Sequence, residues 1–258
     1  MKYVVIADFS GLWHMARHIA LGAPQEFDLH EATTYHLKGK LRTIERKLKE
    51  LGADPIDYFI MAEDRQPVDK LATFPEYRGK RENNQPDRDA VKGMLKAAQL
   101  GLKFCHSDKK EADDVIATLV KKALAKPDLT PIVVAMDCDL WQLCNERTVV
   151  FNPKTMRFIE LQDIIDKFGV KPNQIGLHKA FWGDGSDCIP NVMPRTQKHI
   201  MPLMRQTDGS LEQMSSMMLE VASDLPGKVC DLWEGARLDI VRNYDLVKLN
   251  PDCELVWG

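Results

Sequence analysis

Apolar residues along the chain follow two patterns, short uninterrupted runs and longer stretches with helical spacing. Uninterrupted runs are typical of strands buried on both faces, and they occupy residues 3–7, 57–62, 131–136 and, more weakly, 148–151. Residues 35–52 repeat apolar side chains at helical spacing and end at Gly52, a candidate C-cap. Residues 112–126 do the same, with lysines near their end as the helix dipole favours. Strands that alternate with helices predict an α/β fold with a mostly parallel sheet and flanking helices.

Two other parts of the chain lack this alternation. Residues 65–110 show no strong periodicity and hold 11 Lys or Arg against 6 Asp or Glu, so we expect an exposed, basic connection. From Leu161 onward the pattern stays helical, interrupted by turns that contain glycine or proline. We therefore divide the chain into an α/β core over residues 1–160, which includes the basic segment, and a helical region over residues 161–258.

Composition, charge and residue spacing exclude a few classes of protein. With 258 residues and a net charge of −3, the chain can bury a large core, and any nucleic-acid surface must be local. No apolar run is long enough to span a bilayer, and the N-terminus does not resemble a signal peptide. The six cysteines form no CxxC pair and the histidines show no zinc spacing. A reduced, cytoplasmic protein without a membrane partner is expected.

Carboxylates follow the strong strands directly. The acids at these strand ends are Asp8, then Glu63 and Asp64, then Asp137 and Asp139. A further group lies at the start of the helical stretch 112–126 and consists of Glu111, Asp113 and Asp114. Ligands of open α/β sheets bind at the carboxyl ends of the strands, so these acids are expected to meet at one edge.

Each of these acids, taken alone, has a simpler explanation. An acid often caps the next helix or complements its dipole. Six or more converging carboxylates, however, would raise one another's pKa unless cations lay among them. An all-oxygen cluster selects Mg²⁺ or Mn²⁺, and it holds enough acids for two ions. The basic segment 65–110 would then neutralise the phosphates of a nucleic acid.

A second acidic stretch reads GDGSDCIPNV at residues 183–192. Asp184 and Asp187 lie three apart in it, within a glycine-rich turn. An ordinary loop with Asx-turns would also explain these residues.

Six stretches, taken in order, resemble motifs of the 5′-nuclease family, which includes phage and bacterial 5′→3′ exonucleases, the 5′-nuclease domain of DNA polymerase I and flap endonucleases. They are IADFS (6–10), FPEYRGKR (74–81), EADDVIA (111–117), AMDCDLWQL (135–143), GDGSDCIPNV (183–192) and IVRNYDLVKL (240–249). The resemblance implies a PIN-like 5′-nuclease core, a basic arch over residues 65–110 and a helix-three-turn-helix-like element that binds DNA in the helical region.

The same resemblance implies roles for single residues. The metal ligands would be Asp8, Glu111, Asp113, Asp114, Asp137, Asp139, Asp184 and Asp187. At the second strand either Glu63 or Asp64 would join them, and a count back from EYRGKR without gaps favours Glu63. Tyr77 and Arg78 look like the arch residues that meet the scissile phosphate. Lys70 and Arg81 are expected to bind DNA from the arch.

The chain departs from the family after residue 192. The family usually continues with a glycine-rich hairpin that presents backbone N–H groups to duplex phosphates and often binds potassium. Here residues 193–199 read MPRTQKH, without the glycines that permit close backbone approach. Arg195 and Lys198, three apart on a short helix, would share a face and are expected to hold the duplex instead. The departure weakens the case for a potassium ion.

Together these features predict a two-metal 5′ nuclease that hydrolyses phosphodiester bonds near 5′ ends. Its substrate would be DNA with 5′ ends, flaps or nicks, or an RNA·DNA hybrid, and it would act as a monomer. Two alternatives stay open. One is a PIN-type ribonuclease, which shares the acid-ended sheet. The other is a non-catalytic DNA-structure-binding protein on the same fold.

Overall fold

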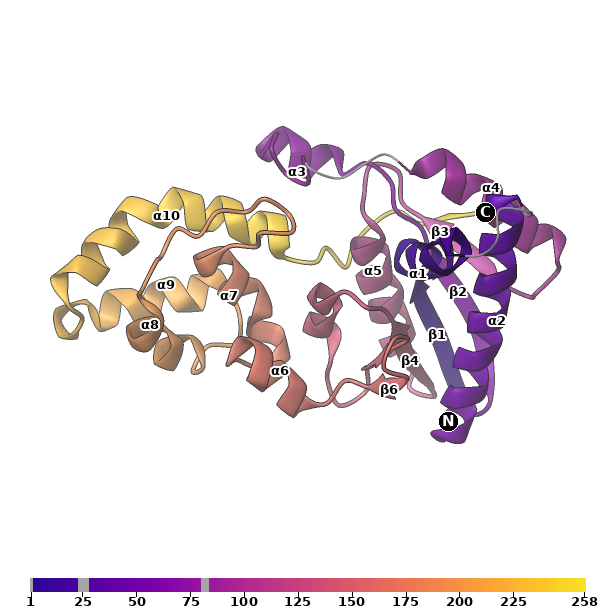
Figure 1. Ribbon diagram of the computed structural model, residues 1–258. Helices are drawn as coiled ribbons and strands as arrows, with labels where there is room; N and C mark the ends of the chain where they lie inside the picture. Colours follow the sequence, from indigo (N-terminus) through magenta and orange to yellow (C-terminus); the bar gives the residue numbers. More distant parts are fainter. Residues whose placement is uncertain (1, 23–27, 80–83) are drawn as a thin grey trace.

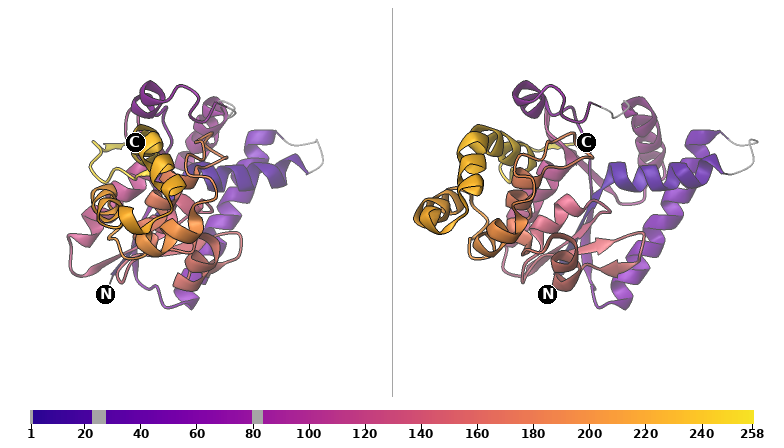
Figure 2. Two further views of the ribbon diagram at one scale, coloured as in Figure 1. Left: turned by 90° about the vertical axis from the view of Figure 1, so that its left-hand side faces the viewer. Right: turned by 60° about the vertical axis from the view of Figure 1, so that its left-hand side comes forward.

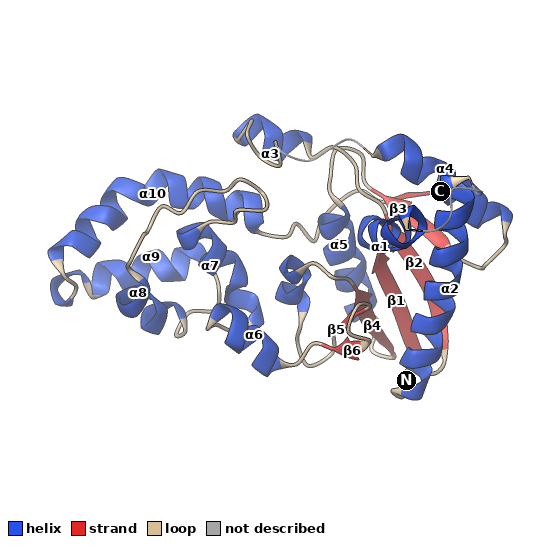
Figure 3. Cartoon of the chain, viewed as in Figure 1, coloured by secondary structure: helices blue, strands red, loops and turns tan. Residues whose placement is uncertain are grey.

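The computed structural model describes residues 2–22, 28–79 and 84–258. Within them, seven strands form one sheet in the order β6-β5-β4-β1-β2-β3-β7 (Figures 1 and 3). The strands are β1 (Lys2–Asp8), β2 (Ile56–Ala62), β3 (Lys103–His106), β4 (Leu129–Val134), β5 (Val149–Asn152), β6 (Arg157–Phe158) and β7 (Val256–Trp257). The inner strands pair in parallel, and only β6 and β7 are antiparallel to their neighbours. The predicted α/β fold is confirmed.

Helices cover both faces of this sheet because consecutive residues of a strand point to opposite sides. On one face, Val5 and Ala7 of β1 pack with α1 (Phe9–Leu21), α2 (Leu29–Glu50) and α4 (Gln85–Ala97). On the other face, Val4 and Ile6 pack with α5 (Ala112–Leu124). The apolar positions of α2 that the spacing predicts are buried, whereas Leu51 caps the helix and is exposed. The central residues of β1 are therefore buried on both faces of the sheet, as its uninterrupted apolar run predicts.

The basic segment 65–110 contains more regular structure than its sequence suggests. It forms α3 (Val68–Thr73), α4 and β3, in place of a mostly irregular connection. Strand β3 is short, so its four residues give little periodic signal. Figure 1 shows α3 and α4 at the top of the view, where the strands β1 and β2 end.

The helical region lies to one side of the sheet (Figures 1 and 2). Its α-helices are α6 (Leu161–Phe168), α7 (Ile175–Trp182), α8 (Gln197–Met204), α9 (Leu211–Glu220) and α10 (Gly227–Val247). Short 3₁₀ turns are η1 (Cys138–Leu143), η2 (Pro172–Gln174) and η3 (Ala222–Asp224). Beyond α10 the chain returns to the sheet, where β7 pairs with β3, so residues 256–257 do not lie with the helices. Among the described helices, none is both long and apolar enough to cross a membrane.

Candidate active site

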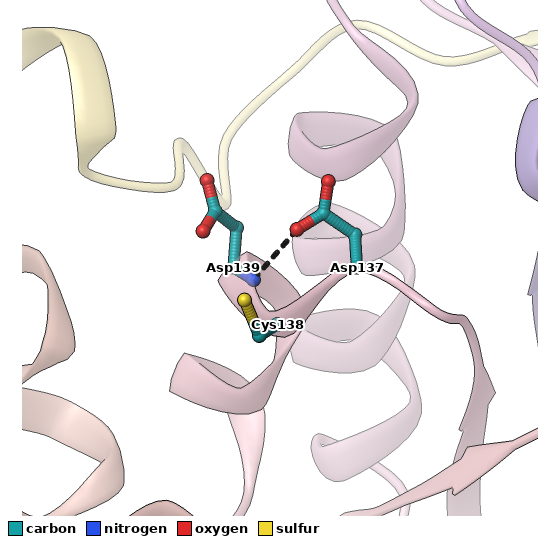
Figure 4. Close-up of side chains that lie close together, drawn as sticks. All are labelled: Asp137, Cys138 and Asp139. Atoms are coloured by element: carbon teal, nitrogen blue, oxygen red, sulfur yellow. Dashed lines mark hydrogen bonds between the residues drawn. The ribbon is translucent and has the colours of Figure 1, made fainter. Parts of the chain in front are cut away.

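Asp8 and Asp137 come from neighbouring parallel strands and therefore reach the same edge of the sheet. Asp8 ends β1 and caps α1, with its carboxylate accepting a hydrogen bond of 3.1 Å from the Gly11 N–H. A Cβ at residue 11 would lie 2.5 Å from that carboxylate, so a side chain there would displace the Asp8 cap. Asp137 follows β4 and caps η1, accepting a bond of 2.9 Å from the Asp139 N–H (Figure 4). Parallel pairing of β1 with β4 thus explains how acids far apart in sequence meet.

The acids at this edge oppose one another's ionisation. Burial, followed by the negative charges of Asp64 and Asp137, raises the pKa of Asp8 to about 7. Burial and the charge of Asp137 likewise raise the pKa of Asp113, on the first turn of α5, well above its ordinary value. Both shifts mean that the carboxylates lack sufficient positive charge from the protein itself. This edge is consequently suited to a divalent cation with oxygen ligands.

At the second strand the structure differs from the expectation that favoured Glu63. The Glu63 carboxylate is buried against Lys92 of α4 at 2.5 Å and Arg65 at 3.3 Å. Asp64 instead interacts with Asp8, and its carboxylate accepts a bond of 2.8 Å from the Ala112 N–H at the start of α5. Asp64 therefore lies among the acids, whereas Glu63 forms an ion pair with the arch helix.

Arg88, a residue that sequence reasoning missed, lies beside Asp64 and helps to keep its carboxylate ionised. It donates to Ser10 Oγ at 2.6 Å and lies 3.4 Å from the Asp64 carboxylate. Burial alone would raise the pKa of Asp64, but Arg78, the Ala112 N–H and Arg88 outweigh it and lower that pKa.

Glu111 is fully buried and surrounded by residues of the arch. Lys70 Nζ lies 2.6 Å from its carboxylate, Arg78 NH1 lies 2.7 Å from it, and the Tyr77 hydroxyl donates to it at 3.0 Å. Burial and the Glu111 charge raise the pKa of Tyr77, so this phenol stays neutral and acts as a donor. Of the predicted arch residues, Lys70, Tyr77 and Arg78 thus lie at the acids, and the two cationic side chains are largely buried.

A further group combines Asp139 of η1 with two acids of the loop after α7. Asp139, Asp184 and Asp187 each offer an oxygen within 4.8 Å of the others. Lys179 of α7 forms ion pairs with both Asp139 and Asp184. Arg78 Nε lies 3.4 Å from Asp187. Each of these three carboxylates therefore faces a cationic side chain.

Asp114 turns away from its neighbour Asp113. Its carboxylate accepts a bond of 2.8 Å from the Asn250 N–H, beyond α10. This bond holds the segment that leads to β7. The contact is structural, whereas the sequence predicted a metal ligand at Asp114.

Comparison with known proteins decides the family. A family model described as "5'-3' exonuclease, N-terminal resolvase-like domain" matches residues 4–169. The chain belongs to this 5′-3′ exonuclease family.

Several curated proteins are similar in sequence to this chain. The DNA polymerase I of Pseudomonas aeruginosa is 28% identical over 229 residues, which cover 85% of this chain and 24% of that protein. The DNA polymerase I of Bacillus subtilis is 30% identical over 182 residues, 63% of this chain and 20% of that protein. The 5′-3′ exonuclease of Aquifex aeolicus is 28% identical over 165 residues, 64% of this chain and 53% of that protein. The chain thus spans about a fifth to about half of the length of these relatives.

Solved structures of the exonuclease type share the fold. A bacteriophage T5 protein co-crystallised with metal ions superposes with a TM-score of 0.72 at 19% identity, covering 96% of this chain and 90% of that one. A T5 flap endonuclease complex with DNA and metal ions gives a TM-score of 0.70 at 19% identity and the same coverage. The similarity extends over the helical region as well as the sheet.

The hairpin at residues 193–199 is built differently from our expectation. Arg195 is exposed in a left-handed turn with φ 61°, before α8 begins, so it does not share a helix with Lys198. Side chains stabilise this glycine-less turn: the Thr196 hydroxyl and the Trp182 indole N–H both donate to the Met193 carbonyl, at 2.7 and 2.9 Å. Arg195 and Lys198 are both exposed, whereas Arg81 lies outside the described residues.

The acids present fit the metal ions that exonucleases of this family imply. Carboxylates dominate the donor set, and Asp8 and Asp113 have raised pKa values that a nearby divalent cation would reverse. Cys138, between Asp137 and Asp139, adds the thiol seen in Figure 4, but burial raises its pKa and keeps it protonated. Hard cations therefore match this site better than soft ones.

Proposed function

We propose that this protein is a divalent-metal-dependent 5′ nuclease that hydrolyses phosphodiester bonds near the 5′ ends of DNA, as a 5′→3′ exonuclease or flap endonuclease. One observation carries the proposal: the acids with raised pKa values, Asp8 and Asp113, share the edge with Glu111 and Asp64, which pair with the arch cations Arg78 and Arg88. Such acids need metal cations, and such cations attract phosphate. Family membership and the shared fold support the same activity.

The acids divide into two sets of candidate ligands. Asp8, Asp113 and Asp137, with Asp64 and Glu111 beside them, would hold one Mg²⁺ or Mn²⁺ ion. Asp139, Asp184 and Asp187 would hold the other. Bound ions of this kind supply hydroxide near neutral pH and stabilise a departing oxygen.

The arch residues would bind and orient the phosphate. Arg78 pairs with Glu111 and Asp187, and it would exchange part of this pairing for a phosphate oxygen. Its charge would then stabilise the negative charge that develops during hydrolysis. Tyr77 would hold Glu111 in place through its hydroxyl. No side chain needs to act as a general base.

The DNA would contact both the α/β core with its arch and the helical region. A 5′ single strand would pass by the arch, and the duplex would lie along the helical region over residues 161–258. Arg195 and Lys198 would contact it there. An RNA·DNA hybrid as substrate, a monomeric state and a cytoplasmic location belong to the same proposal.

Cleavage of end-labelled substrates tests this function. Flap, nicked, RNA·DNA and single-stranded RNA substrates are incubated with Mg²⁺, with Mn²⁺ and with EDTA, and Asp113→Asn serves as the inactive control. Cleavage near the 5′ ends of DNA that stops in EDTA and returns with metal is expected. Activity that persists in chelator rejects metal dependence. Cleavage confined to RNA indicates a PIN-type ribonuclease, and DNA binding without cleavage indicates a non-catalytic protein.

A further inference from the structure

The two sets of acids differ in how the protein compensates their charge. At the strand ends, Arg78 and Arg88 pair with Glu111 and Asp64, and no ion pair of the described residues involves Asp8, Asp113 or Asp137. In the other set, the Lys179 ammonium pairs with both Asp139 and Asp184. A cation therefore lies directly on the second set, whereas Asp8, Asp113 and Asp137 have none of their own in the described part of the chain.

The cation in that second set is the ammonium of Lys179. Only 7% of this side chain is exposed, and its Nζ contacts Asp139 and Asp184 at once. The turn after α7 brings Lys179 and Asp184 together. Helix α7 ends at Gly183, where φ is 77° and a Cβ would lie 2.5 Å from the Ile189 carbonyl. The chain then turns back so that Asp184 lies beside Lys179, one turn earlier on the helix.

A lysine ammonium and a divalent ion compete for the same carboxylate oxygens. Asp139, Asp184 and Asp187 have oxygens within 4.8 Å of one another, a spacing that suits a single ion. Lys179 uses oxygens of two of these three acids. Its stem of four methylene groups can rotate, so the ammonium can leave without a change in the backbone.

We propose that Lys179 is an exchangeable internal cation, which occupies the Asp139–Asp184–Asp187 group in the resting protein and sets the affinity of the second divalent ion. This inference rests on the proposed function, because it assumes that both sets of acids bind metal. The first ion then binds at Asp8, Asp113 and Asp137 without displacing Lys179. The second ion binds only as the Lys179 ammonium is expelled, so it binds more weakly.

Lysine acylation of the wild-type protein gives a direct test. The protein is treated with acetic anhydride at increasing Mn²⁺ concentrations, and acetylation is located by mass spectrometry. Lys179 should stay unreactive without metal and with one equivalent, and become reactive as the second ion binds. Exposed Lys171 serves as the internal reference and should react equally throughout. Protection of Lys179 that persists after two ions have bound overturns the inference.

Ion counting on a variant gives the second test. Free Mn²⁺ is measured by electron paramagnetic resonance during titration of wild type, Lys179→Met and the control Lys171→Met. Lys179→Met should bind the second ion at least about tenfold more tightly, with the first affinity unchanged. Equal second affinities in all three proteins overturn this inference alone. If no protein binds Mn²⁺, the proposed function fails as well. If Lys179→Met does not fold, the acylation of wild type decides the question.

Discussion

Arg78 lies 2.7 Å from the Glu111 carboxylate and 3.4 Å from that of Asp187, so one arch side chain joins the start of α5 to the loop after α7. The Arg78 backbone N–H also donates to the Asp187 carbonyl at 3.2 Å. Apolar contacts of Tyr77 with Ile189, Leu246 and Val247 support this junction. Arg78 and Tyr77 of the arch therefore lie inside the acidic cluster.

Replacement of Arg78 tests whether this junction acts on the phosphate. Arg78→Ala should lower kcat by about a hundredfold or more while KM changes little, because its charge acts mainly in the transition state. Arg78→Lys should recover part of kcat, since it keeps a cation. Steady-state kinetics on a flap substrate measure both constants. A loss confined to KM would show that Arg78 only attracts DNA.

The two acids after β2 should respond differently to neutralisation. Asp64→Asn should lower kcat strongly, because Asp64 lies beside Asp8. Glu63→Gln should keep kcat within about threefold but reduce the free energy of unfolding by about 1–3 kcal/mol, since buried Lys92 loses its charged partner. Kinetics and urea unfolding of both variants measure these effects. A strong loss of kcat in Glu63→Gln, with kcat of Asp64→Asn unchanged, would indicate that Glu63 is the metal ligand.

Neutralising Asp8 should stabilise the metal-free protein. Its folded pKa is about 7, above an unfolded value near 3.8. Between these values the unfolded state binds fewer protons, so this group makes stability fall as pH rises, by at most about 4 kcal/mol. Asp8→Asn should therefore raise Tm in EDTA, more at pH 8 than at pH 5, and still cap α1 through its amide oxygen.

The same variant should lose stabilisation by metal. Added Mn²⁺ should raise the Tm of wild type, because an ion that binds only the folded state stabilises it, and raise that of Asp8→Asn much less. Thermal denaturation with and without Mn²⁺ measures both effects. A Tm in EDTA that Asp8→Asn lowers at pH 8 would contradict the predicted repulsion.

The exposed hairpin cation should contribute to duplex binding. Arg195→Ala should weaken binding of a nicked hairpin and reduce the slope of log affinity against log salt by about 1, because the protein would neutralise one phosphate fewer. Cleavage of a short single strand should be unchanged. Lys228→Ala, at the exposed start of α10, is the matched control and should leave the slope as in wild type. Parallel slopes for Arg195→Ala and wild type would place the duplex elsewhere.

Sequence alone predicted four strands of the sheet and the acids at its edge. The apolar runs of β1, β2, β4 and β5 predict buried parallel strands, because strands covered on both faces need apolar side chains at every position. Once those strands are parallel, their carboxyl ends coincide, and Asp8 and Asp137 must approach each other. The motif at Glu111 then adds the first turn of α5 to the same edge.

Tertiary structure decided which partner each charged side chain takes. Adjacent residues such as Glu63 and Asp64 diverge in direction, and no periodicity says which one faces the cluster. The arch cations look like a solvated basic tract in sequence, yet the packing of α3 and α4 turns Lys70, Arg88 and Lys92 inward. Lys179 carries no motif of its own, and it meets Asp139 only through the fold. Desolvation fixes these pairings, because a buried charge must find an opposite charge nearby, whatever the separation along the chain.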